Sequence, residues 1–127
     1  MARVLALVGD LMFGSRVQGT LQAGGHQVEL IGDAAGLRAR LAEPAQAAPE
    51  VLVVDLADPQ LDGAQLAEQL AREGALARVR TLGCYSHVDV PARERAARAG
   101  FDLVVPRSRL VREGAALVSR LAASPEA

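Results

Sequence analysis

Five residues that can bind a metal ion or an anion stand just behind short apolar runs of the sequence. Asp10 and Asp55 each end such a run, and Tyr85, Ser86 and Arg107 follow two later ones. Two carboxylates that meet repel each other, and a divalent cation relieves the repulsion. Mg²⁺ prefers carboxylate, water and phosphate oxygens, so Asp10 and Asp55 could supply its protein ligands. Arg107 would then face the anion that the metal brings.

The apolar runs predict five β-strands. Each run is rich in Val and Leu, is too short for a stable helix, and ends in turn formers or polar residues. The first, third and fifth runs are apolar throughout, which predicts strands covered on both faces, as in a parallel sheet flanked by helices. The runs lie at 4–8, 28–31, 51–54, 79–82 and 103–105.

Segments with helical spacing lie between and after these runs. Phe13 and Leu21 belong to an apolar set that recurs every four residues, and Asp33, Asp89 and Ser108 stand where helix N-caps are expected. With right-handed crossovers, this order predicts an α/β fold: a doubly wound, five-stranded parallel sheet with five helices on its two faces. Ligands of such sheets bind at the carboxyl ends of the strands, so the metal- and anion-binding residues should meet at that edge.

Composition narrows the class of protein. A chain of 127 residues holds one domain, which we assign to residues 1–123, with a short tail at 124–127. The net charge is −1, and all 14 basic residues are Arg, so the balance is not that of a nucleic-acid-binding domain. Cys84 is the only cysteine, which excludes an internal disulfide and indicates either a reducing compartment or a small buried apolar side chain. The first apolar run is too short for a signal peptide or a membrane span, so we expect a cytoplasmic protein without membrane contact.

The loop after the third run resembles the phosphoacceptor loop of two-component response regulator receiver domains. Pro59 and Gly63 stand four and eight positions after Asp55, as in that family. Arg107 stands seven positions after Gly100, where the family has a basic residue. The resemblance covers nearly the whole chain and implies the flavodoxin-like receiver topology, with strand order 2-1-3-4-5.

The resemblance also implies a signalling role rather than turnover catalysis. Asp55 would accept a phosphoryl group from a histidine kinase or a small phosphodonor. Asp10, Asp55 and the backbone carbonyl of Ala57 would hold Mg²⁺. Phosphoryl transfer needs mainly in-line positioning and neutralised oxygen charge, which such a site provides. Because the chain leaves no room for an output domain, a stand-alone receiver would signal through contacts with a downstream protein.

Three departures from the family pattern indicate an atypical receiver. Gly9 stands where receivers carry a further acid, so we expect weakened Mg²⁺ binding. Arg107 replaces the family's Lys, and a planar guanidinium is not equivalent to an ammonium. Tyr85 aligns with the small hydroxyl residue that senses the phosphate, and Ser86 is one position away.

These departures leave two functions open. In the first, phosphorylation of Asp55 regulates docking to a protein partner. In the second, the protein is a pseudo-receiver: Arg107 pairs with Asp10 or Asp55 in the metal pocket, and the chain acts as a constitutive adaptor. A hydrolase that uses Ser86 and His87 is a third class, but the G-x-S-x-G elbow of such enzymes is absent from the sequence.

Basic residues gather in the second half of the chain. Residues 1–64 carry four Arg and eight acidic residues, whereas residues 65–127 carry ten Arg and seven acidic residues. In receivers the fourth helix, fifth strand and fifth helix commonly form the partner face, and a basic patch there would attract an acidic protein surface. We expect a monomer or a weak homodimer. The predicted face contains Arg93, Arg95, Arg98, Arg109 and Arg112.

Overall fold

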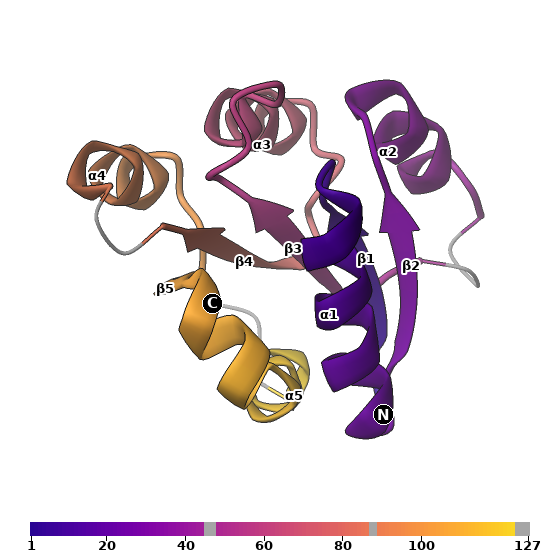
Figure 1. Ribbon diagram of the computed structural model, residues 1–127. Coiled ribbons are helices and arrows are strands. Elements are labelled where there is room, and N and C mark those ends of the chain that lie inside the picture. Colours follow the sequence, from indigo (N-terminus) through magenta and orange to yellow (C-terminus); the bar gives the residue numbers. More distant parts are fainter. Residues whose placement is uncertain (45–47, 87–88, 124–127) are drawn as a thin grey trace.

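The computed structural model describes residues 1–44, 48–86 and 89–123, in which strands and helices alternate strictly (Figure 1). The predicted tail at 124–127 lies outside the described residues. No helix among the described residues is long and apolar enough to span a membrane. The strands are β1 (Arg3–Leu7), β2 (Gln27–Ile31), β3 (Val51–Asp55), β4 (Arg80–Tyr85) and β5 (Leu103–Pro106). The helices are α1 (Leu11–Ala23), α2 (Ala34–Leu41), α3 (Gly63–Arg72), α4 (Val90–Arg98) and α5 (Arg107–Ala123).

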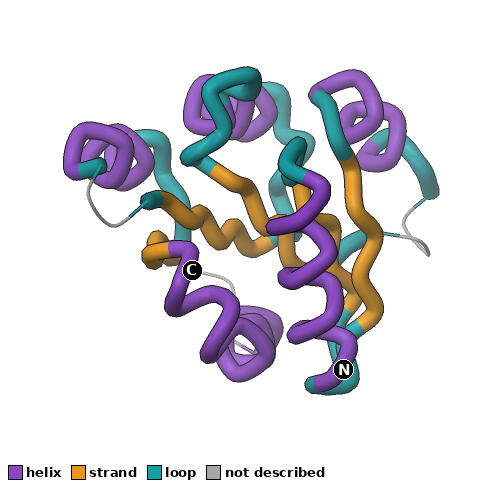
Figure 2. The backbone as a smooth tube through the Cα atoms, in the orientation of Figure 1, coloured by secondary structure: helices purple, strands orange, loops and turns teal. Residues whose placement is uncertain are grey.

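The five strands pair in parallel in the order β2-β1-β3-β4-β5, which confirms the predicted fold class and topology. Helices α1 and α5 pack on one face of the sheet, and α2, α3 and α4 lie on the other (Figures 1 and 2). Alternate residues of β3 serve the two faces, as the pleat of a strand requires. Val51 and Val53 join the core under α1 and α5, whereas Leu52 and Val54 join the core under α2 and α3.

The place of a strand in the sheet decides how far it is buried. All five residues of β3, in the centre, are buried, whereas in the edge strand β5 only Val105 is buried. Helices α4 and α5 still contact β5 from the two faces of the sheet, as predicted, and its other residues are half-buried because no strand of the described residues pairs beyond it. An apolar run does not distinguish an edge strand from a central one, because the neighbours that cover a strand come from distant parts of the chain.

Four of the five helices begin after an aspartate whose carboxylate accepts a hydrogen bond from a backbone N–H of the first turn. Helix α5 differs, because it follows β5 without a loop and begins at Arg107. Ser108 therefore lies inside the first turn, and its predicted role as the N-cap is wrong. The capping aspartates of α1 to α4 are Asp10, Asp33, Asp62 and Asp89.

Candidate functional site

Asp55 and Arg107 form a bidentate ion pair at the carboxyl edge of the sheet. Asp55 ends β3 and is fully buried, with 0% of its surface exposed. Arg107 begins α5; its Nε donates to Asp55 Oδ1 at 3.1 Å, and its Nη2 donates to Asp55 Oδ2. Arginine favours this geometry because the planar guanidinium matches the two carboxylate oxygens. Each oxygen of the Asp55 carboxylate therefore has a cationic donor.

Two further groups complete the surroundings of Asp55. The backbone N–H of Ala57 donates to Asp55 Oδ1 at 3.1 Å, and Cys84 Sγ lies 3.8 Å from the same oxygen. Burial raises the pKa of the Cys84 thiol, and the negative charge of Asp55 raises it further, so the thiol stays protonated. The hydrogen bond to Asp55 raises the pKa of the Arg107 guanidinium. The cluster thus combines one positive charge, one carboxylate and a neutral thiol.

Phe13 contacts the arginine from α1. The guanidinium carbon of Arg107 lies 4.2 Å from the centroid of the Phe13 ring, which is a cation–π distance. The arginine is therefore held between a carboxylate and an aromatic ring, and 30% of its side chain stays exposed. The helical spacing of the apolar residues includes Phe13 but does not indicate this contact, because no spacing rule relates positions 13 and 107.

Asp10 reaches the same edge but binds a different partner. Its Oδ1 accepts hydrogen bonds from the backbone N–H groups of Met12 at 3.0 Å and Phe13 at 3.1 Å, so it caps α1. The charge of Asp10 also contributes to the raised pKa of Arg107, after the larger effects of Asp55. The structure thus brings positions 10, 55 and 107 to one edge, and the direct pairing is between Arg107 and Asp55.

A hollow of about 440 Å³ lies between the first turns of α1 and α5, and we call it the α1–α5 hollow. Asp10, Ser86 and Arg107 are among the residues that line it. Tyr85, the other residue predicted to sense phosphate, is buried at the end of β4 and does not line the hollow. The hydrolase hypothesis also needs His87, which lies outside the described residues.

In this structure the two carboxylates predicted to bind Mg²⁺ make other contacts. Arg107 binds both oxygens of Asp55, and Asp10 uses its Oδ1 to cap α1. In the part of the chain that the structure describes, no three His, Cys, Asp or Glu side chains form a group that could hold a metal ion. The N–H of Ala57, whose carbonyl is the third predicted ligand, donates to Asp55. A metal ion bound to the Asp55 carboxylate would compete with the guanidinium for its oxygens.

Asp58 occupies the space beside Gly9. A Cβ atom at Gly9 would lie 2.3 Å from Asp58 Oδ2, closer than real Cβ contacts allow. Asp58 Oδ1 accepts a hydrogen bond from the N–H of Gln60 at 2.8 Å, which stabilises this conformation of the loop after β3. A larger residue at position 9 would therefore require the Asp58 carboxylate to shift. The carboxylate of Asp58 therefore lies beside the position where the acid is missing, and its only signal in the sequence is its place three residues after Asp55.

Gly63, eight positions after Asp55, has a packing role. Gly63 is the first residue of α3, and a Cβ atom there would lie 2.6 Å from Val54 Cγ1. The absence of a side chain lets the start of α3 approach β3 closely. Pro59 is exposed in the same loop. The spacing of these two residues from Asp55 therefore reflects the junction between β3 and α3 and is compatible with an acceptor that is not phosphorylated.

Solved structures that resemble the chain are receiver domains. The receiver domain of a Francisella response regulator has 16% identity and a TM-score of 0.80, with 96% of this chain and 97% of that chain covered. A signal receiver domain of a histidine kinase from Syntrophus aciditrophicus has 18% identity and a TM-score of 0.82, with 100% and 96% covered. The receiver domain of a sensor histidine kinase from Pseudomonas aeruginosa, with magnesium coordinated in its active site cleft, has 17% identity and a TM-score of 0.81, with 97% and 98% covered.

These likenesses extend over almost the full length of each chain. The chain has the receiver-domain fold. No protein-family model and no curated protein matches its sequence. The Pseudomonas domain coordinates magnesium in its cleft, whereas in this receiver fold the guanidinium of Arg107 covers the carboxylate at the acceptor position.

The predicted partner face of this receiver fold carries both charges. Three of its arginines are paired with acids: Glu113 lies 3.5 Å from Arg109 and 3.0 Å from Arg112, and Asp62 lies 2.9 Å from Arg95. The net positive charge of the face is therefore smaller than the arginine count indicates. The two remaining predicted arginines are exposed on α4: Arg93 and Arg98.

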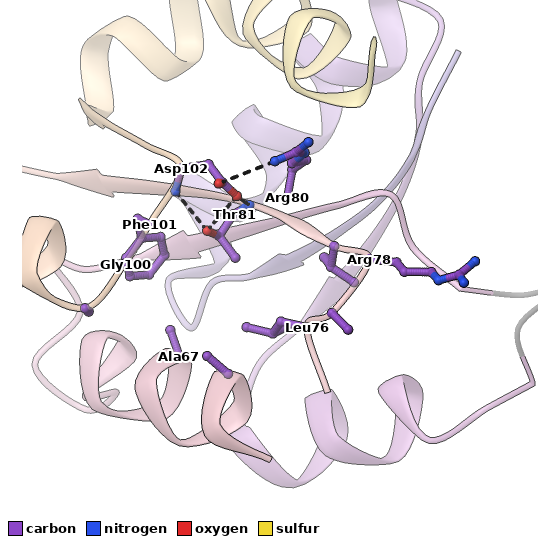
Figure 3. Close-up of a pocket in the computed structure, with 12 residues that line it drawn as sticks. Ala67, Leu76, Arg78, Arg80, Thr81, Gly100, Phe101 and Asp102 are labelled. Carbon is purple, nitrogen blue, oxygen red and sulfur yellow. Dashed lines mark hydrogen bonds and ion pairs between the residues drawn. The ribbon is translucent and has the colours of Figure 1, made fainter. Parts of the chain in front are cut away.

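A second hollow, of about 270 Å³, lies at the amino edge of the sheet beside the ends of α3 and α4 (Figure 3). Asp102 Oδ2 accepts hydrogen bonds from the backbone N–H of Thr81 at 2.7 Å and from its hydroxyl at 3.2 Å. The Thr81 hydroxyl in turn accepts from the backbone N–H of Asp102 at 3.0 Å. Arg80 Nη1 lies 3.8 Å from Asp102 Oδ1. These contacts, drawn as dashed lines in Figure 3, join the start of β4 to the residue before β5.

Proposed function

We propose that the protein is a receiver-fold signalling adaptor that binds protein partners and does not use Asp55 as a metal-assisted phosphoacceptor. The observation that carries this proposal is the ion pair at the carboxyl edge, in which a fully buried Asp55 receives guanidinium donors on both oxygens. This is the second of the two functions that the sequence left open. No turnover reaction is part of it.

The energetics of burial favour a permanent pair. An ionised carboxylate inside a protein costs several kcal/mol unless it is paired and hydrogen-bonded. Arg107 offsets this cost for Asp55 with two charge-assisted hydrogen bonds, and the ring of Phe13 stabilises the guanidinium from its other side. A phosphodonor that approaches Asp55 would meet the guanidinium on whichever oxygen it engages. The contacts that stabilise the site therefore also oppose phosphorylation.

Incubation with Mg²⁺ and a small acyl phosphate, followed by intact-mass measurement, tests the proposal. We expect no phosphoryl adduct on the wild-type protein, because both oxygens of the nucleophile are bound. Arg107→Lys is the matched variant, because it restores the residue that the family carries there. An adduct found only in this variant would support the role of the guanidinium, whereas a wild-type adduct that is lost in Asp55→Asn would overturn the proposal.

Regulation by phosphorylation of Asp55 is the second candidate function. It is supported by the position of Asp55 at the end of β3 in a receiver fold, with Pro59 and Gly63 at the family's spacing. In this function a histidine kinase supplies the phosphoryl group, and Arg107 leaves the carboxylate when the aspartyl phosphate forms. The same mass measurement separates the two candidates, because only this one yields an adduct on Asp55.

Partner binding provides an independent test of the adaptor function. We expect an acidic protein surface to bind the exposed arginines of α4, Arg93 and Arg98, by charge complementarity. Quantitative affinity capture should recover equal amounts of a partner with wild-type protein and Asp55→Asn, and less with the double variant Arg93→Glu/Arg98→Glu. A folded Asp55→Asn variant that loses its partner would contradict constitutive binding.

A further inference from the structure

The α1–α5 hollow is separated from the acceptor carboxylate by the arginine between them. Asp55 does not line the hollow, whereas Arg107 lines it and holds Asp55 on its other edge. Helices α1 and α5 lie side by side on one face of the sheet (Figure 1), and the hollow opens between their first turns. A ligand in this hollow would therefore contact the guanidinium without reaching the buried carboxylate.

Two guanidinium groups face the α1–α5 hollow. A guanidinium has five N–H donors, and Arg107 uses its Nε and one donor of Nη2 for Asp55. The remaining donors of Arg107 belong to the part of the side chain that stays exposed. Arg16 lines the hollow from α1, and no hydrogen bond or ion pair within the described residues engages it. Arg16 thus forms no ion pair with an acid in the described part of the molecule.

Hydroxyl and backbone donors add to the two cations. Ser86 follows β4 and lines the hollow, and Ser108 lines it from the first turn of α5. Backbone N–H groups in the first turn of a helix have no partner inside the helix. The first turn of α5 therefore contributes a partial positive charge. Donors from α1, α5 and the segment after β4 therefore surround the same space.

Another part of the lining is apolar. Met12, Phe13 and Val111 line the hollow, and Met12 is 81% exposed. Leu11, the residue before it, is 87% exposed. Large exposed apolar side chains beside a group of hydrogen-bond donors favour a ligand with an apolar body and a charged end.

One acid opposes the cations. Asp10 lines the hollow, and its Oδ1 is held by the cap of α1. Its charge lowers the affinity for any anion but does not cancel two guanidiniums. A cation would instead meet Arg16 and Arg107 against this single acid, so the balance of charges favours an anion.

We propose that the α1–α5 hollow binds a small oxyanion that carries an apolar group, with the oxyanion between Arg16 and Arg107 and the apolar group against Met12 and Val111. The inference rests on the proposed function, because it requires Arg107 to stay on Asp55. It adds a mode of regulation: reversible binding of an anion beside the pair replaces covalent phosphorylation of the carboxylate.

Titration with phenyl phosphate, followed by backbone amide NMR shifts, tests this site. We expect saturable shifts around the first turns of α1 and α5, and binding about tenfold weaker in Arg16→Gln, as the loss of one charge-assisted hydrogen bond predicts. Arg72→Gln is the matched control, because Arg72 is an exposed helical arginine on α3, outside the hollow. Its binding should equal that of the wild type. Phenol, which lacks the anion, should give no saturable shifts there.

A charge-removing variant sharpens the test. Asp10→Asn keeps an N-cap acceptor for α1 and removes the negative charge from the hollow, so phenyl phosphate should bind about two- to fivefold more tightly. The inference is overturned if phenyl phosphate does not saturate, if Arg16→Gln and Arg72→Gln weaken it equally, or if Asp10→Asn weakens it. Such a failure, with no adduct in the mass experiment, removes only the ligand site. A wild-type adduct on Asp55 removes the adaptor function itself.

Discussion

Each edge of the sheet carries an aspartate with an arginine beside it, and the two pairs are built differently. At the carboxyl edge, Asp55 is fully buried and both of its oxygens bind Arg107. At the amino edge, 34% of the Asp102 side chain is exposed, Thr81 donates two hydrogen bonds to one oxygen, and Arg80 lies 3.8 Å from the other. The Asp55 carboxylate depends on a single cation. The Asp102 carboxylate instead interacts with a backbone N–H, a hydroxyl group, an arginine and solvent.

This difference shows how burial changes the role of the same two residue types. A buried charge cannot lose its partner without a large cost, so the pair of Asp55 and Arg107 holds β3 and the start of α5 together across 52 positions of sequence. An exposed pair contributes little by itself. Asp102 acts mainly through its hydrogen bonds to Thr81, which join the amino ends of two neighbouring strands.

The largest effect is expected from removal of the buried cation. Arg107→Met should lower the free energy of unfolding by about 3–5 kcal/mol, because it leaves the Asp55 carboxylate buried without its partner. Chemical denaturation measures this change directly. A loss below about 1 kcal/mol would show that Asp55 does not depend on Arg107, and that the two edges are equivalent.

The reactivity of the Cys84 thiol gives a second test of the site around Asp55, and this test needs no denaturant. Because burial and the charge of Asp55 raise the pKa of its thiol, Cys84 in the wild-type protein should resist alkylation by iodoacetamide at pH 8. Arg107→Met should react faster, since loss of the pair makes opening of the site more frequent. Equal labelling rates in the two proteins would show that the loss of Arg107 does not make opening of the site around Cys84 more frequent.

The next largest effect is expected to be a partial recovery of stability in a double variant. The double variant Asp55→Asn/Arg107→Met removes the buried charge together with its partner, so it should regain about 2 kcal/mol or more relative to Arg107→Met alone. A double-mutant cycle by chemical denaturation measures the coupling. If the double variant is no more stable than Arg107→Met, uncompensated charge is not the reason for the loss.

A smaller effect is expected at the amino edge. Asp102→Ala removes two hydrogen bonds to Thr81 and should lower the free energy of unfolding by about 1–2 kcal/mol, because the backbone N–H of Thr81 loses its acceptor. The same denaturation experiment applies. A loss of stability as large as that of Arg107→Met would mean that exposure to solvent does not reduce the cost of breaking the contacts of Asp102.

The smallest effect is expected from the arginine beside Asp102. Arg80→Met should change the free energy of unfolding by about 0–1 kcal/mol through this ion pair, because the pair is long and its carboxylate is partly solvated. This variant is also the control for Arg107→Met, since both replace an arginine that pairs with an aspartate. A loss of 3 kcal/mol or more, about the value for a broken buried pair, would remove the distinction between the two edges.

Much of the fold could be predicted from local patterns. The apolar run at 51–54 became β3, and Asp33 and Asp89 begin helices as expected from their positions. The features that these patterns missed depend on neighbours: most of β5 is only half-buried, and Ser108 lies inside α5. Burial of an edge and the length of a strand–helix junction follow from packing, so a local pattern does not contain them.

Part of the candidate site could also be predicted. The rule that ligands bind at the carboxyl ends of parallel strands brought Asp10, Asp55 and Arg107 to one edge. This rule did not decide whether Arg107 would pair with an acid or lie beside a metal ion. The contact with Phe13 and the place of Asp58 beside Gly9 were missed, because both depend on side-chain positions across the sheet edge.

By itself, the sequence determined the order of strands and helices and placed its charged residues at strand ends. It did so because hydrophobic periodicity and capping are local properties of the chain. Only the tertiary structure decided that the guanidinium of position 107 covers the carboxylate of position 55 and leaves a hollow with a second arginine beside it. The free energy of a charge depends on burial and on nearby partners, and both are set by side chains that are distant in the sequence.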